Sequence, residues 1–169
     1  MTHLISHGWN IRFHPLFSKQ RLDLVNNVKK IKDRLSDEKE YRSHPQVKLF
    51  LAVRQGYLEH IPSDPFSLRF ALKDDLRRYS RLKGMGLPNR YRLFFRVYQQ
   101  EEQKEIVILW LGYPRKEGDK NDCYAVFQKM VLNGTFPASM QELIEQCEIG
   151  NGIIEATDEG GKDEIGDNK

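Results

Sequence analysis

Residues 89–97 read Asn-Arg-Tyr-Arg-Leu-Phe-Phe-Arg-Val, and residues 106–110 read Ile-Val-Ile-Leu-Trp. In an extended chain, successive side chains point to opposite faces. A strand over 90–98 then has a cationic face and an apolar face, formed by Arg90, Arg92, Phe94, Arg96 and Tyr98, and by Tyr91, Leu93, Phe95 and Val97. The second stretch is apolar on both faces, as a central strand is. The two stretches predict a sheet whose cations suit phosphate or carboxylate, and so RNA or another polyanion.

The segments before this pair predict helices followed by further strands. Apolar residues recur at helical spacing over 17–35 and again over 47–58, after Pro45 at an early helix position. Residues 66–72 alternate Phe and Leu with Ser, Arg and Ala, which predicts a strand, and 79–83 is a shorter candidate. Helices that precede strands in this way indicate the α+β class, with a helical pair packed on a mostly antiparallel sheet.

The C-terminal part predicts two short helices and a tail. Asp122 is a suitable cap for a helix that stops at Asn133-Gly134, and Ser139 to Glu142 has capping-box spacing. From Gly150 onward the chain is rich in Gly, Asp and Glu, a composition typical of disorder. We therefore expect one domain over residues 1–149 and an acidic, disordered tail over 150–169.

Composition excludes several classes of protein. The net charge is +3, yet residues 150–169 hold six acidic and two basic residues, so the remainder of the chain is distinctly basic. The N-terminus has no signal-peptide pattern, and no apolar run approaches the roughly 20 residues that span a bilayer. Neither the two cysteines nor the five histidines show metal-binding spacing. We expect a cytoplasmic protein without a metal or another cofactor.

The chain resembles a known family over about residues 7 to 146. The matching segments are His7-Gly8-Trp9, His14-Pro15 with Phe17, Glu59-His60-Ile61, residues 90–96, Val107-Ile108-Leu109, residues 122–130, and Gly134, Pro137 and Glu142-Leu143. On these segments the chain is similar to the YhaV family of type II toxin–antitoxin toxins, within the RelE-like superfamily of small endoribonucleases.

This resemblance implies a fold, an activity and partners. The implied fold has two N-terminal helices on a four-stranded antiparallel sheet. Family members are implied to cleave mRNA, usually on the ribosome, and so to inhibit translation and growth. Their implied partner is a PrlF-type antitoxin, through which the complex reaches operator DNA.

The resemblance also assigns roles to residues. Metal-independent RNA cleavage uses the 2′-hydroxyl as nucleophile, so the enzyme removes its proton, stabilises charge on the phosphate and assists the leaving 5′-oxygen. The implied catalytic residues are Lys83 as base or charge clamp, Arg92 on the scissile phosphate, Arg115 near the leaving group, and Tyr124 for stacking or for orienting the 2′-hydroxyl. The implied RNA contacts are Arg81, Arg90, Arg96 and Lys116.

Each assignment has a structural alternative. Arg92 can be a solvated strand residue, Lys83 an ordinary surface lysine, and Tyr124 a core aromatic beside Phe127. His60 is an alternative base, because its ordinary pKa suits neutral pH. At a helix end, however, a histidine often only satisfies the last carbonyls.

Two other functions remain open at this point. A non-catalytic module with the same fold would use the basic face to bind RNA or an antitoxin–operator complex. An inactivated toxin is the other, although the arginines and Tyr124 are present.

Overall fold

The computed structural model describes residues 4–113 and 122–147 of the 169-residue chain. Its five strands form one sheet in the order β1-β2-β5-β4-β3. Their bounds are Leu4–Ser6 for β1, Trp9–Phe13 for β2, Ser80–Leu82 for β3, Arg92–Gln100 for β4 and Gln103–Gly112 for β5. Neighbouring strands are antiparallel, except that β2 and β5 are parallel.

The β4–β5 hairpin forms the centre of the sheet. Its register shifts between Phe94 and Phe95, which pair with Trp110 and Ile108. Leu109 is therefore an extra residue in β5, which makes a β-bulge. Because of this bulge, Leu109 and Trp110 both contribute to the core on the same side of the sheet.

A helical pair, α1 (Pro15–Arg34) and α3 (Pro45–Gln55), covers one face of the sheet, with the short α2 (Glu38–Ser43) between them. The His14 ring caps α1 by accepting the N–H of Leu16, and His44 caps α3 in the same way. We call the apolar cluster under these helices the first-face core; it includes Phe17, Val25, Val28, Val53, Leu93, Phe95, Ile106 and Ile108.

The second helix of this pair continues through a π-helical turn, η1 (Gly56–His60), into α4 (Ile61–Ser63). A Cβ atom on Gly56 would lie 2.6 Å from Leu82 Cδ2. The missing side chain thus allows the helix to approach β3 closely.

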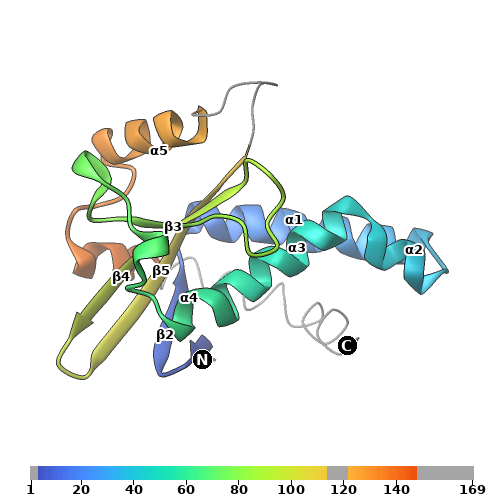
Figure 1. The fold of residues 1–169 in the computed structure, drawn as a ribbon, viewed down its shortest axis with the longest axis horizontal. Helices are drawn as coiled ribbons and strands as arrows, with labels where there is room; N and C mark the ends of the chain where they lie inside the picture. Colours follow the sequence, from blue (N-terminus) through green and yellow to red (C-terminus); the bar gives the residue numbers. More distant parts are fainter. Residues whose placement is uncertain (1–3, 114–121, 148–169) are drawn as a thin grey trace.

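The opposite face is covered by α5 (Asp122–Leu132) and by helical residues 140–147. In Figure 1, α5 lies across the sheet from the long helices. The ring centroids of Phe94 and Phe127 stack 4.1 Å apart. We call this cluster the second-face core; it includes Tyr79, Phe94, Leu109, Trp110, Phe127 and Leu143.

The ends of these last helices follow the predicted capping chemistry. At the end of α5, the N–H of Thr135 donates to Met130 and that of Gly134 to Val131, with φ +76° at Gly134. This pattern is a Schellman motif, which glycine favours. Ser139 Oγ accepts the Glu142 N–H at 3.3 Å, as in a capping box.

The α+β class, with a helical pair on a mostly antiparallel sheet, is confirmed, although the sheet has five strands instead of four. The strand predicted over 66–72 is wrong, because these residues hold a 3-10 turn, η2 (Leu68–Phe70). Ser67 Oγ accepts the N–H of Arg69, a local bond that competes with strand pairing. A second 3-10 turn, η3 (Asp74–Leu76), follows.

The N-terminal hairpin β1–β2 was not among the predicted strands. Its two-residue turn, His7-Gly8, has φ values of +52° and +81°, as tight hairpins require. Both tryptophans, Trp9 and Trp110, are buried.

The acidic tail, 150–169, lies outside the described residues. Within residues 4–113 and 122–147, no helix combines the length and apolar character needed to cross a membrane. In the same part of the chain, His, Cys, Asp and Glu nowhere form a group of three or more that could hold a metal ion.

Candidate active site

Three side chains from separate parts of the chain meet at one hydroxyl group. Tyr124 lies in the first turn of α5, Arg81 in β3 and Arg92 at the start of β4. The Nε atoms of Arg81 and Arg92 lie 3.0 Å and 2.9 Å from Tyr124 Oη. All three residues are half-buried. We call them the arginine–tyrosine cluster.

Strand pairing brings the two arginines together. Arg81 lies opposite Phe94 in the β3–β4 ladder, and Arg92 is two residues from Phe94, hence on the same face. Main-chain carbonyls hold both side chains: Arg81 Nη1 donates to Arg69 and Arg92 Nη1 to Tyr91, each at 2.8 Å. The guanidinium groups are therefore oriented by the protein itself.

Tyr124 is both a core residue and a polar one. Its ring meets Phe94 edge-on, with centroids 5.7 Å apart, and Arg92 Cζ lies 5.9 Å from the Tyr124 centroid. Packing of this kind fixes the position of a tyrosine hydroxyl. The ring of Tyr124 therefore contributes to packing on this face, as the structural alternative expects, while its hydroxyl is held between the two arginines.

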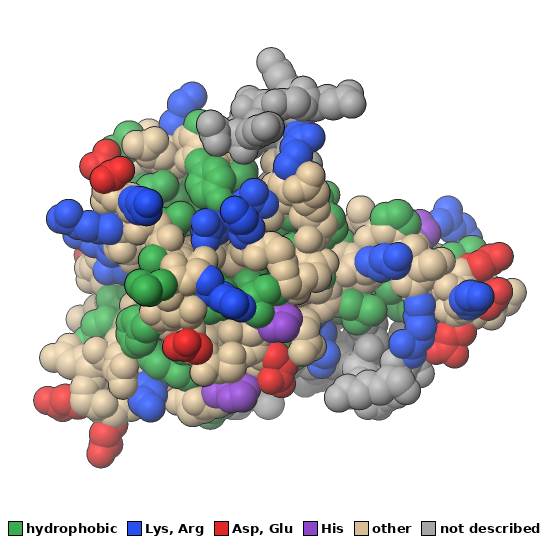
Figure 2. Space-filling view, viewed as in Figure 1, with side chains coloured by type: hydrophobic (Ala, Val, Ile, Leu, Met, Phe, Trp, Pro, Cys, Tyr) green, Lys and Arg blue, Asp and Glu red, His purple; other side chains and the backbone are tan. Residues whose placement is uncertain are grey.

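Among the residues that the structure describes, no carboxylate neutralises the charge of the cluster. Within the described residues, neither Arg81 nor Arg92 forms an ion pair. Tyr124 Oη accepts from both arginines, so its own proton remains available for donation, and each guanidinium has more N–H donors than these bonds use. In Figure 2, Lys and Arg side chains gather on the face below α5. This arrangement suits a phosphate group.

Arg96 lies farther along the same face of β4 and is engaged with the protein. Its Nη1 donates to the Ala138 carbonyl at 2.9 Å, and its Cζ lies 5.8 Å from the Tyr79 ring centroid. Burial lowers the pKa of Arg96, an effect that Tyr79 opposes and Arg78 reinforces. Arginine nevertheless stays protonated near neutral pH. Arg96 therefore connects β4 to the segment that precedes residues 140–147.

Arg90 and Lys83 lie outside the strands in which they were predicted. The chain turns before β4, and Arg90 has φ +73°, so the prediction that it shares the strand face of Arg92 is wrong. Lys83 is exposed and follows the last residue of β3, so strand alternation does not place it beside Arg81. No hydrogen bond joins Lys83 to the cluster in the part of the chain that the structure describes.

A family model described as a toxin with endonuclease activity, of a toxin–antitoxin system, matches residues 11–148. The chain belongs to the YhaV toxin family. Ribonuclease toxin YhaV of Escherichia coli strain K12 is 34% identical over 150 residues, which cover 83% of this chain and 93% of the relative. Toxin YhaV of Escherichia coli O6:H1 matches with the same identity and coverage. No solved structure gives a significant match.

The segment matched to YhaV toxins contains the whole cluster and both remaining site candidates. Arg115 and Lys116 lie within residues 114–121, outside the described residues. In the sequence, these residues connect Gly112, the end of β5, to Asp122, the start of α5. Tyr124 follows two residues later.

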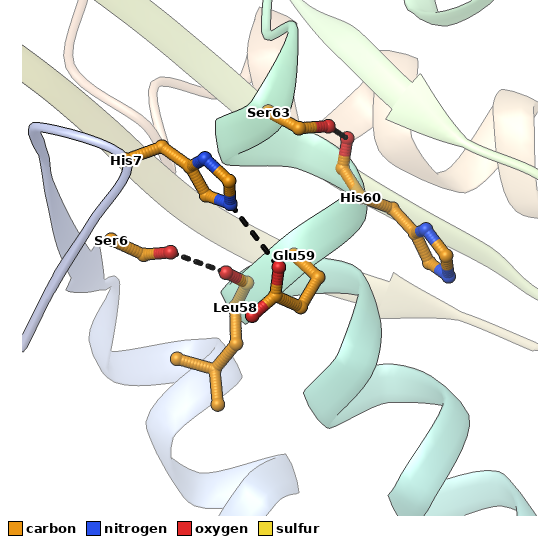
Figure 3. A network of polar contacts seen from close by, with 6 residues as sticks. All are labelled: Ser6, His7, Leu58, Glu59, His60 and Ser63. Carbon is orange, nitrogen blue, oxygen red and sulfur yellow. Dashed lines mark hydrogen bonds and ion pairs between the residues drawn. The ribbon is translucent and has the colours of Figure 1, made fainter.

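His60, the alternative base in this YhaV-family chain, ends the π-helical turn η1. Its main-chain carbonyl accepts from Ser63 Oγ at 3.1 Å. In Figure 3 its ring points away from the neighbouring pair of His7 Nε2 and Glu59 Oε2, which are 3.1 Å apart. Tyr57 in η1 belongs to the first-face core, whereas Tyr124 packs against the second. The structure thus does not bring His60 to the cluster.

An open pocket beside the second-face core was not part of the sequence interpretation. Its volume is about 490 Å³, and its lining residues are Asp74, Asp75, Arg77, Arg78, Tyr79 and Val131. The available signal was the run Arg77-Arg78-Tyr79, two cations beside an aromatic directly before the strand of Arg81. Such runs recur where proteins bind single-stranded nucleic acid.

Proposed function

We propose that this protein is a ribonuclease toxin that cleaves mRNA at the arginine–tyrosine cluster, without a metal, and so halts translation and growth in the cytoplasm. Its family is that of toxins with endonuclease activity, which supports the nuclease part of the proposal. The observation that carries the site is the pair of guanidinium groups on one tyrosine hydroxyl, with no carboxylate paired to either among the described residues.

The proposed reaction is attack by the 2′-hydroxyl on the adjacent phosphorus. A bond forms between O2′ and phosphorus and the bond to O5′ breaks, which gives a 2′,3′-cyclic phosphate and a 5′-hydroxyl end. Arg81 and Arg92 stabilise the negative charge that builds up on the phosphate oxygens. Tyr124 donates its hydroxyl proton in a hydrogen bond to one of these oxygens. The 2′-hydroxyl proton passes to a base, and O5′ takes up a proton as it leaves.

The remaining roles belong to residues around the cluster. Lys83, exposed after β3 and two residues from Arg81, is the proposed base or charge clamp. His60 is the weaker alternative, because it ends η1, whose Tyr57 belongs to the first-face core. Arg115 would act electrostatically on the leaving oxygen, since guanidinium is a poor acid. Supporting RNA contacts are assigned to Arg90, Arg96 and Lys116.

The partners of this reaction follow from the same proposal. A toxin–antitoxin system implies an antitoxin, as the family description states. We assign it to the PrlF type, which would also link the complex to operator DNA. The substrate would be mRNA on the ribosome. There a basic face can bind the phosphates of both the mRNA and the ribosomal RNA.

Controlled expression with mapping of mRNA 5′ ends tests the function. Wild type should arrest growth and create new 5′-hydroxyl ends, and Arg92→Ala should abolish both while still co-purifying with the antitoxin. Arg42→Ala is the control, because Arg42 lies in α2, where it pairs with Glu38. It should behave as wild type. Arrest without new ends would favour the non-catalytic binding module; ends that persist in Arg92→Ala would place the chemistry elsewhere.

A further inference from the structure

The pocket beside the C-terminal half of α5 is not used by the proposed reaction. Tyr79 is buried in its wall and Val131 is half-buried. Its other lining residues are exposed and charged: Asp74, Asp75, Arg77 and Arg78. Within the described residues, none of these four forms an ion pair. The pocket therefore offers two carboxylates and two guanidinium groups to a ligand.

The pocket and the arginine–tyrosine cluster lie in line along α5. Arg81 contacts Tyr124, Tyr79 meets Phe127 edge-on with centroids 5.4 Å apart, and the pocket joins residues 74–79 to Val131. Figure 1 shows the green turn of this segment beside the far end of α5. Seven residues of helix, from Tyr124 to Val131, span about 10 Å. A single RNA strand covers that distance within a few nucleotides.

The two aspartates decide which part of the RNA the pocket accepts. Ionised carboxylates are acceptors only, so they repel a phosphate and require N–H donors. Guanine has two adjacent donors, N1–H and the N2 amino group, which one carboxylate can accept together. Adenine and cytosine place a ring acceptor beside their amino group, and uracil places its single N–H between two carbonyl oxygens. Arginine complements guanine further, because O6 and N7 are acceptors.

We propose that this pocket is a guanine-binding subsite for a nucleotide near the cleaved phosphodiester. Asp74 and Asp75 accept from N1–H and the amino group, and Arg77 and Arg78 bind O6 or the attached phosphate. The inference rests on the proposed function, since it assumes that single-stranded RNA crosses the cluster. It adds a base preference to a site that otherwise recognises only phosphate.

Binding of uncleavable RNA tests the subsite separately from cleavage. The probes are fluorescent 2′-O-methyl oligouridines that carry one central guanine, inosine or adenine, and fluorescence anisotropy gives their Kd. Inosine lacks only the N2 amino group. Wild type should bind the guanine probe about tenfold more tightly than the adenine probe, with inosine between them. In the Asp74→Asn/Asp75→Asn variant the three affinities should become equal within about twofold.

The controls separate base recognition from charge and folding. Glu101→Gln/Glu102→Gln removes the same charge from two exposed residues at the tip of the β4–β5 hairpin and should keep the preference. Asp74 has φ +56°, a conformation that asparagine tolerates, so the aspartate variant should fold. A wild type without guanine preference, or an Asp74→Asn/Asp75→Asn variant that keeps it, would overturn the subsite. Failure of the proposed function would show instead as the absence of new mRNA 5′-hydroxyl ends when the wild type is expressed in cells, whichever probe the protein binds.

Discussion

The two faces of the sheet are closed in different ways, although β4 supplies both. Leu93 and Phe95 enter the first-face core, beneath two long helices. Phe94 enters the second, beneath α5 and residues 140–147, with Arg92 at its margin. The first face is closed mainly by apolar side chains. The second leaves the cations of the arginine–tyrosine cluster at an accessible edge, and this is where we propose that the chemistry takes place.

An arginine bound to a tyrosine occurs on both faces, which makes the comparison sharper. In the first-face layer, buried Arg21 donates through Nε to Tyr57 Oη at 3.0 Å. On the second face two arginines, Arg81 and Arg92, donate to Tyr124, and all three are half-buried. A pair enclosed in the core serves packing. Two guanidinium groups on one accessible hydroxyl leave positive charge for a ligand.

The largest expected effect comes from truncating a buried side chain in either core, at neighbouring positions of β4. Leu93→Ala should cost about 2–5 kcal/mol and Phe94→Ala about 3–5 kcal/mol of unfolding free energy, because both side chains are fully buried. Urea denaturation measures both values. Cleavage per folded molecule should fall only for Phe94→Ala, which removes the ring beside Tyr124. Equal losses of activity would break the division between the faces.

The tyrosine pair offers a matched test of chemistry. Tyr124→Phe removes the acceptor shared by Arg81 and Arg92, and we expect RNA cleavage to fall by about one to two powers of ten while stability changes by about 1 kcal/mol. Tyr57→Phe should cost about 1–3 kcal/mol, since Arg21 loses a buried acceptor. Its cleavage rate, measured on folded protein, should stay at the wild-type level. A slow Tyr57→Phe enzyme would contradict this contrast.

Two glycines test how tightly each face is closed. A Cβ on Gly112 would lie 2.9 Å from Cys123 Cβ in α5, and one on Gly56 would lie 2.6 Å from Leu82 Cδ2. Each Gly→Ala change should cost about 1–3 kcal/mol through overpacking. Gly112→Ala should also slow cleavage, because the shifted start of α5 carries Tyr124. Unchanged kinetics in Gly112→Ala would show that the cluster tolerates movement of this helix.

The smallest effect is a pH dependence at the junction of the two faces. His14 caps α1, while its Nε2 lies 3.0 Å from Gln146 Oε1 in the last helix. Burial lowers the pKa of His14 below 6.5, which the Gln146 hydrogen bond only partly offsets. The folded protein then binds this proton less readily than the unfolded chain. The contribution of neutral His14 to the unfolding free energy is therefore fully present above pH 6.5, and it is lost as the pH falls below that value.

His14→Asn should remove this decline, because asparagine retains a capping acceptor but does not titrate. Urea midpoints measured between about pH 7.5 and 5 would show it. His44→Asn, the corresponding change at α3, serves as the control and should keep the wild-type slope. A slope that survives in His14→Asn would assign the effect to other groups.

The sequence predicted the parts of the fold whose periodicity extends over many residues. The helices over 17–35 and 47–58 and the central hairpin have long, regular patterns, and tertiary packing agrees with them. The alternation over 66–72 predicted a strand wrongly. Phe66 and Leu68 are exposed and only Phe70 is buried, so these residues have no continuous buried face. The missed strands β1 and β2 are short, although His7-Gly8 carried a hairpin signal.

For the site, the sequence identified residue types but not their contacts. Alternation placed Arg92 on the correct face, and a helix beginning near Asp122 placed Tyr124 early in it. That Tyr124 meets Arg81 depends on how α5 lies across the sheet, which no local pattern encodes. Arg90 was placed wrongly by the same alternation rule, because it lies in a turn with positive φ just before the strand begins.

The order of the helices and strands along the chain also sets the order in which the two faces can form during synthesis. Every strand and the helical pair precede residue 113, whereas the cover of the second face comes from residues 122–147. Since chains fold from the N-terminus as they emerge, the first face can close while the second is still being translated. The nascent chain therefore acquires a stable scaffold before it acquires Tyr124. The sheet and the helical pair of this toxin would therefore emerge from the ribosome before the proposed active site is complete.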